Sequence, residues 1–175
     1  MTRTLSPATI KAMYSTESSE ILITLLKITI PAVGTTLEKI IYLADNYIDR
    51  LSATVNDPEI IYGVTSNSIQ YRFLPMEIVL PNDDAASAPK CNITLHDVTR
   101  YLIADLRNLT EAPAVDLKLV LSSSPNLEEI SFTGFKLTNI TYNAETISAE
   151  LTMPSLEVEP FPAYSFTPAY FPGLF

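Results

Sequence analysis

Apolar and polar residues alternate along two stretches in the second half of the chain, and this period of two constrains the fold most. The apolar members of these stretches are Val115, Leu117, Leu119 and Leu121 in the first and Ile147, Ala149, Leu151 and Met153 in the second. Successive side chains of a strand point to opposite faces of a sheet. A turn at "SSSPN" and a return at "LEEISFTGFKL" lie between them. The sequence therefore predicts an antiparallel meander with one buried face.

The first half of the chain contains further strand candidates. The segment Ile21–Ile30 is rich in β-branched residues and ends at Pro31, which favours a buried strand. The segment Leu37–Asp45 is a second candidate. The stretch "IIYGVTSNSIQYRF" predicts two strands joined by a turn at Thr65–Ser68.

A break in strand parity follows this hairpin. Tyr71 and Phe73 share one parity, whereas Met76, Ile78 and Leu80 have the opposite one. Parity changes only where the ladder is interrupted, and a proline cannot donate a ladder hydrogen bond. We expect a bulge or kink at Leu74–Pro75.

Two segments predict helices. Ser6 followed by Pro7 is typical of an N-cap and first helical position, which favours a short helix over Pro7–Tyr14. The second helix is expected at about residues 95–109, with Thr94 and Asp97 as a pair resembling a capping box. Its apolar stripe consists of Leu95, Val98, Leu102, Leu106 and Leu109.

These elements predict a mainly β (α+β) protein: an antiparallel β-sandwich or barrel with one packed α-helix, a short N-terminal helix and an extended C-terminal arm. Residues 1–153 would form the domain. Residues 154–175 would form the arm, because their prolines exclude a central strand.

The arm is the candidate interaction site. It carries six aromatic residues and no charge between Phe161 and Phe175, and the aromatic residues are Phe161, Tyr164, Phe166, Tyr170, Phe171 and Phe175. Interspersed prolines favour polyproline II, so little entropy would be lost on docking. The arm would fold back over its own sheet, dock on a neighbouring subunit, or do both.

Charge and hydropathy exclude several classes of protein. The net charge of −9 and the absence of a basic stripe argue against nucleic-acid binding. The apolar run at 21–30 is too short to span a bilayer, and the N-terminal residues contain no signal-peptide core. We expect a soluble protein made in the cytosol.

Reactive groups are few. His96 is the sole histidine, and the adjacent Asp97 would point away from it on a helix, so we expect a surface histidine in a first helical turn. Cys91, the sole cysteine, is expected to be a buried structural thiol. We therefore expect no enzyme activity, no metal and no cofactor.

Other polar motifs are interpreted as surface features. Asn82, Asp83 and Asp84 lack further calcium ligands at the required spacing and predict a solvated loop. The pairs Glu128–Glu129 and Glu157/Glu159 are expected to be exposed edge charges that oppose aggregation. The glycosylation motifs at Asn92, Asn108 and Asn139 would not meet the glycosylation machinery without a signal sequence.

Four segments carry a resemblance to a known family. They are "YRFLPMEIVLPNDD", "ITLHDVTRYLIADLRNL", "VDLKLVLSSSP" and "EPFPAYSFTPAYFPGLF", and the terminal "FTPAYFPGLF" is the most specific. From about Ile60 to Phe175 the chain resembles small tail proteins of siphophages and prophages, a family known only as a domain of unknown function.

The resemblance implies a minor tail component similar to distal-tail or tail-tip ring proteins, which share a β-sandwich-plus-helix fold with tail-tube subunits. It implies a virion protein assembled in the bacterial cytoplasm as a cyclic homo-oligomer, with a hexamer implied, between the tail tube and the hub or fibres. An acidic chain lining such a conduit would repel DNA.

Three alternatives stay open. The chain could be a β-sandwich module that binds host glycans, although it lacks tryptophan. It could be a tail assembly factor that is not retained in the virion. A hydrolase dependent on His96 is the third. The sequence also does not distinguish a distal-tail ring from a tail terminator or a head–tail connector.

Overall fold

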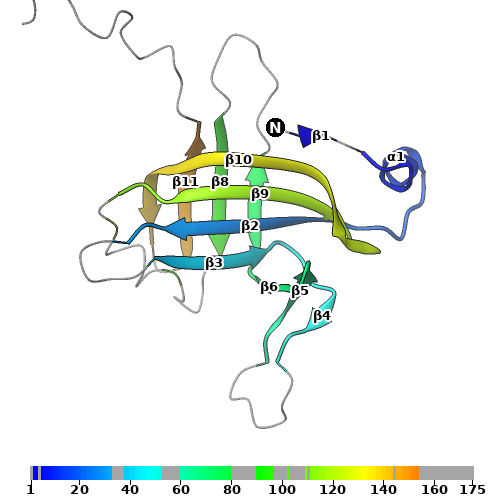
Figure 1. Ribbon diagram of the computed structural model, residues 1–175, viewed down its shortest axis with the longest axis horizontal. Coiled ribbons are helices and arrows are strands. Elements are labelled where there is room, and N and C mark those ends of the chain that lie inside the picture. Colours follow the sequence, from blue (N-terminus) through cyan, green and yellow to red (C-terminus); the bar gives the residue numbers. More distant parts are fainter. Residues whose placement is uncertain are drawn as a thin grey trace, which may run out of the picture.

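The strands of the protein join in a single, strongly curved sheet (Figure 1). The computed structural model describes residues 2–3, 5–32, 38–52, 60–79, 90–96, 102, 109, 111–143 and 145–153. Within these residues the strands are β1 (Thr2–Arg3), β2 (Leu22–Ile30), β3 (Lys39–Ala44), β4 (Asp49–Arg50), β5 (Tyr62–Ser66), β6 (Ile69–Phe73), β7 (Met76–Val79), β8 (Lys90–His96), β9 (Ala114–Leu121), β10 (Ser124–Tyr142) and β11 (Thr146–Thr152). The mainly β class is confirmed.

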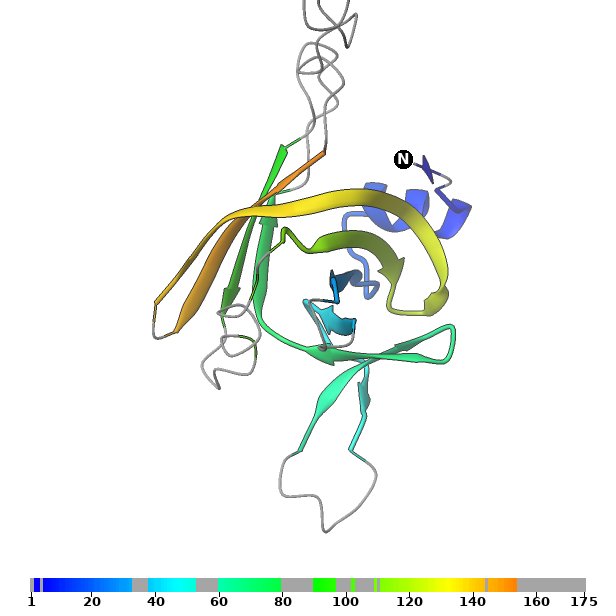
Figure 2. The same cartoon turned by 60° about the vertical axis from the view of Figure 1, so that its left-hand side comes forward.

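The strand order is β4-β5-β6-β3-β2-β9-β10-β11-β8-β7, and β1 pairs with β10 outside this path. Neighbouring strands are antiparallel except β3 and β6, which are parallel. The long strand β10 contains several register shifts and bends over the molecule (Figure 2). Gly134 lies at one of these irregularities with φ 82°, a conformation that a residue with a Cβ atom rarely adopts.

The curvature brings two halves of the sheet face to face around the main core. Strands β2, β3 and β9 supply Leu26, Leu43 and Leu117 from one half, and β8, β10 and β11 supply Ile93, Leu137 and Leu151 from the other. The alternating residues of β9 and β11 point into this core, as their period of two predicts. The residual cavity between them is about 10 Å³, no more than the space that one water molecule needs.

The chain crosses between the two halves at Leu74–Pro75, where the sequence predicts a break. The Leu74 N–H donates to the Ala44 carbonyl at the end of β3, at 2.9 Å. The Pro75 carbonyl accepts from the His96 N–H at the end of β8, also at 2.9 Å. The ladder is interrupted between β6 and β7, so the predicted kink is confirmed.

The hairpin predicted around Thr65–Ser68 is also confirmed. It consists of β5 and β6, with Asn67 and Ser68 at φ 48° and 66°. Positive φ at both central residues is typical of the type I′ turn that matches the twist of a hairpin. On the outer face of the sheet, Val64 and Tyr71 of this hairpin pack against Ile23, Leu25, Ala44 and Val120, forming a second, smaller core.

One of the two predicted helices is confirmed. Helix α1 spans Pro7–Tyr14, and the Ser6 hydroxyl caps it by accepting from the Thr9 N–H at 3.2 Å. The helix expected at about 95–109 was wrong at its start, because Leu95 and His96 belong to β8 and Thr94 pairs with Ser148 of β11. Most of its remaining residues lie outside the described part. No described helix has the length and apolarity needed to cross a membrane.

Candidate interaction surfaces

An exposed group of aromatic rings lies where β4, β5 and β6 protrude from the sheet. Tyr47 precedes β4, Tyr62 begins β5 and Phe73 ends β6. The Tyr47 ring centroid is 5.2 Å from that of Tyr62 and 5.1 Å from that of Phe73. Tyr47 is 51% exposed and Tyr62 is 43% exposed. We call these three residues the aromatic cluster.

Local backbone packing brings these rings together. Gly63 faces Asp49 of β4 and Arg72 of β6, and its carbonyl accepts from the Ile48 N–H at 2.9 Å. A Cβ atom at Gly63 would overlap the Tyr71 carbonyl and the Leu51 side chain. Only glycine therefore allows the close approach of the strands that places Tyr62 beside Tyr47.

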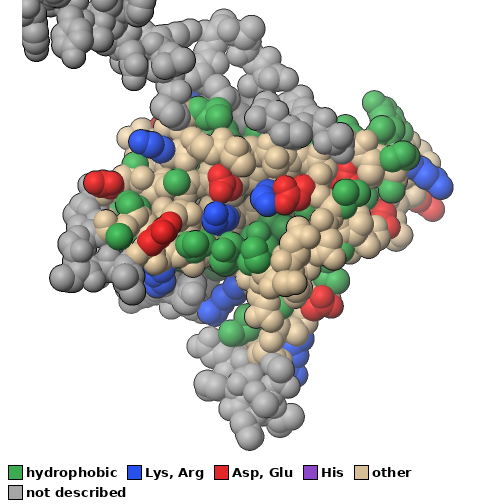
Figure 3. Space-filling model, viewed as in Figure 1, with side chains coloured by type: hydrophobic (Ala, Val, Ile, Leu, Met, Phe, Trp, Pro, Cys, Tyr) green, Lys and Arg blue, Asp and Glu red, His purple; other side chains and the backbone are tan. Residues whose placement is uncertain are grey.

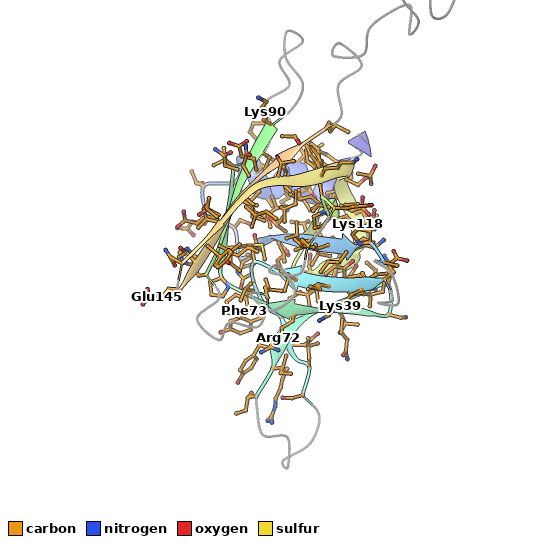
Figure 4. All side chains as sticks on the ribbon, turned by 90° about the vertical axis from the view of Figure 1, so that its left-hand side faces the viewer. Lys39, Arg72, Phe73, Lys90, Lys118 and Glu145 are labelled. Atoms are coloured by element: carbon orange, nitrogen blue, oxygen red, sulfur yellow. The ribbon has the colours of Figure 1, made fainter. Side chains whose placement is uncertain are left out.

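Two further exposed apolar side chains lie near the cluster in the chain. Ile48 directly follows Tyr47 and is 39% exposed, and Ile60 lies two positions before Tyr62 and is 60% exposed. Figure 4 shows Arg72 and Phe73 at the end of the molecule that is opposite Lys90. Tyrosine and phenylalanine are enriched at protein interfaces, so this group of neighbouring, partly exposed rings is a candidate interaction surface.

A second exposed apolar surface lies on α1. Met13 and Tyr14 lie three and four positions after Ile10, so the three residues share one side of the helix. They are 44%, 67% and 87% exposed, respectively. We call these three residues the helix face. Figure 3 shows apolar side chains gathered at the end of the molecule where α1 lies.

The start of α1 is attached to the sheet by a buried carboxylate. Glu129 of β10 is 1% exposed, and its Oε2 accepts from the Ser6 N–H at 2.6 Å. Burial works against ionisation of Glu129, but the Ser6 N–H and the hydroxyl groups of Ser6 and Thr9 outweigh it and lower its pKa. The other oxygen, Oε1, is buried without a hydrogen-bond partner in the described part of the chain. The helix is therefore held by polar contacts at its N-cap, which leaves the helix face free for another partner.

This placement corrects the prediction that Glu128 and Glu129 are exposed edge charges. Glu128 is partly buried and forms an ion pair with Lys118 of the neighbouring strand β9. Glu129 is enclosed beneath the start of α1. This contact could not be predicted from local sequence signals, because it joins residues 123 positions apart. Glu157 and Glu159 lie outside the described residues.

Two further residues singled out in the sequence, His96 and Cys91, lie in the described part of the chain. His96 lies in β8 rather than in a helix, with its Nε2 3.9 Å from Glu77 Oε1. Cys91 is buried as expected, and burial raises the pKa of its thiol to about 11. No group of three or more potential metal ligands occurs among the described residues. Asn82, Asp83, Asp84 and Asn108 fall outside that part of the chain.

A shallow polar groove of about 300 Å³ lies on the outer face of β8, β10 and β11. Its lining includes Asn92, Thr94 and Ser148. Asn139 Nδ2 donates to Glu150 Oε2 at 2.7 Å within it, so two of its polar groups already satisfy each other. None of the lining residues is aromatic.

The predicted arm residues Phe161, Tyr164, Phe166, Tyr170, Phe171 and Phe175 lie outside the described residues, and their docking stays a prediction. The sequence did not reveal the aromatic cluster, because its members come together only through tertiary folding. A glycine directly after Tyr62 was the one available signal, since glycine in a strand often marks a close backbone approach.

Comparison with known proteins gives no assignment. No protein-family model matches the sequence, and no curated protein matches it.

Proposed function

We propose that the protein is a structural component of a phage virion, a minor tail protein that forms a ring or adaptor between the tail tube and the hub. It acts by binding copies of itself and neighbouring tail proteins rather than by catalysis. The observation that carries this proposal is the pair of exposed apolar surfaces, the aromatic cluster and the helix face, on separate elements of one domain. The tail location is supported by the resemblance of four sequence segments to small tail proteins.

Two different surfaces on one chain favour a head-to-tail assembly. Such an assembly closes into a ring when the rotation between copies permits. Each copy carries a net charge of −9, so copies repel one another at long range. Association must therefore come from burial of apolar area, at about 25 cal/mol per Å².

The glycan-binding alternative finds less support. Sugar rings stack on flat aromatic faces and need polar side chains beside them. The rings of the aromatic cluster are inclined to each other by 47° and 65°, so they do not share a plane. The polar groove lies on β8, β10 and β11, far along the strand order from β4 and β5.

Light scattering coupled to size exclusion tests the assembly with the full chain. We expect an oligomer that is lost in Met13→Glu, which places a charge in the helix face. Ala8→Glu introduces the same charge at an exposed position of α1 outside that face and is the matched control. A monomer at high concentration for the unaltered chain would refute the proposal.

The location in the particle requires mass spectrometry of purified virions. A tail component is retained at a constant ratio to the tube protein. Its absence from intact particles would instead identify an assembly factor.

A further inference from the structure

The aromatic cluster has the chemistry of a site for a proline-rich strand. Sites that bind polyproline II ligands are lined by aromatic rings, between which proline and apolar side chains insert. Tyrosine suits this purpose because its ring is apolar and its hydroxyl group can donate to the free carbonyl groups of the ligand. Tyr47 and Tyr62 offer both features from a half-exposed position, and Phe73 supports Tyr47 from behind at 5.1 Å.

The chain itself contains a ligand of this chemistry. Residues 160–175, the C-terminal segment, combine four prolines with six aromatic residues and carry no charged side chain. Prolines favour polyproline II before binding, so the entropy lost on docking is small. The absence of charge also spares this segment the repulsion that acts between acidic copies.

We propose that the aromatic cluster of one copy binds the C-terminal segment of a neighbouring copy in an extended, polyproline II conformation. This inference rests on the proposed self-assembly and adds the site that receives the segment.

The direction of the last strand favours a neighbouring copy over the same copy. Strand β11 ends at Thr152, which pairs with Lys90. Lys90 and Phe73 lie at opposite ends of the molecule (Figure 4), and Figure 1 shows the same separation between the end of β11 and β4. The chain therefore leaves the domain at the end remote from its own cluster. At about 3.1 Å per residue, a polyproline II strand formed by residues 154–175 would span roughly 70 Å, so its length permits contact with either copy, and it is the direction of β11 that favours a second one.

Site-specific crosslinking of the full chain tests the contact. Cys91→Ala removes the native thiol, and Ile48→Cys then places a thiol beside the cluster. A second variant in the same background carries Ala169→Cys in the C-terminal segment. We expect a mixture of the two variants to yield a covalent heterodimer with a short bismaleimide. Glu145→Cys, at an exposed turn between β10 and β11, replaces Ile48→Cys as the control and should yield at least tenfold less product.

Other results would overturn the inference. If the mixture yields no crosslinked product, the contact is contradicted. A variant with Ile60→Cys, at an exposed position, repeats the test in case Ile48→Cys itself disturbs the local structure. A double variant carries both cysteines in one chain. If it forms only an intrachain crosslink, the C-terminal segment lies on the cluster of its own chain, and this result also contradicts the proposal. Light scattering separates this failure from that of the proposed function: oligomers without crosslinks refute the inference alone, whereas monomers refute the assembly.

Removal of a cluster ring gives a second measurement. Tyr62→Ala should reduce the crosslinking yield between Ile60→Cys and Ala169→Cys at least tenfold. Tyr142→Ala removes a ring of similar exposure, 49% against 43%, from β10 and should leave the yield unchanged. Equal yields in the two variants would contradict the proposal.

Discussion

At the scale of single residues, Glu129 anchors the start of α1 to the sheet. A buried carboxylate is costly unless hydrogen bonds compensate it. Here the first backbone N–H of the cap and two neighbouring hydroxyl groups favour the charged form. One side chain thus fixes where α1 begins, and consequently where the helix face is presented.

Replacement of Glu129 tests this role. Glu129→Ala removes the acceptor of the Ser6 N–H, and a hydrogen bond to a charged group contributes about 1.5–3 kcal/mol. We expect amide exchange in α1 to accelerate while exchange in β9 and β11 stays slow, as measured by hydrogen-exchange mass spectrometry. Glu128→Ala removes a carboxylate of the partly exposed ion pair with Lys118 and should leave α1 protected. Equal exchange in the two variants would refute the anchoring role.

The lowered pKa of Glu129 also predicts a pH dependence with a definite sign. A carboxyl group whose pKa is lower in the folded state stabilises the fold above its unfolded pKa, and this contribution is lost as pH falls through the folded value. The attachment of α1 should therefore weaken on acidification below the ordinary pKa of a glutamate, about 4.3. NMR shifts of the α1 amides would report the change, and Glu129→Gln should abolish it. A titration that moves α1 equally in the Gln variant would count against this account.

At the scale of elements, glycines at two positions have different consequences. Gly63→Ala would place a Cβ atom against the Tyr71 carbonyl, which the hairpin cannot relieve without moving β5 from β6. We expect a loss of at least about 2 kcal/mol in urea unfolding, together with disruption of the aromatic cluster. Gly134→Ala meets open space and should cost only the strain of positive φ, about 1–2 kcal/mol, with the cluster intact. A smaller loss for Gly63→Ala than for Gly134→Ala would contradict the packing.

The success of prediction from sequence also differs among the elements. Helix α1, strands β2, β3, β9 and β11 and the kink at Leu74–Pro75 follow from local signals: a cap, a high content of β-branched residues, a period of two and a proline. The end of β8 does not, because Leu95 fits a helical stripe as well as a strand. Its pairing with Ile147, 52 positions later, resolves the ambiguity. The aromatic cluster and Glu129 stay hidden for the same reason, since both depend on contacts between distant segments.

At the scale of the whole molecule, the type of interaction that holds the copies together, apolar contact or ion pairing, determines how assembly responds to salt. Copies with a net charge of −9 repel one another, and added salt screens this repulsion. Assembly through the aromatic cluster and the helix face, both apolar, should therefore strengthen between low salt and about 0.5 M sodium chloride, where the Debye length falls to a few ångströms. Sedimentation velocity at fixed protein concentration measures the shift. The Met13→Glu variant should remain monomeric throughout, and assembly that weakens with salt would show that ion pairs hold the copies together.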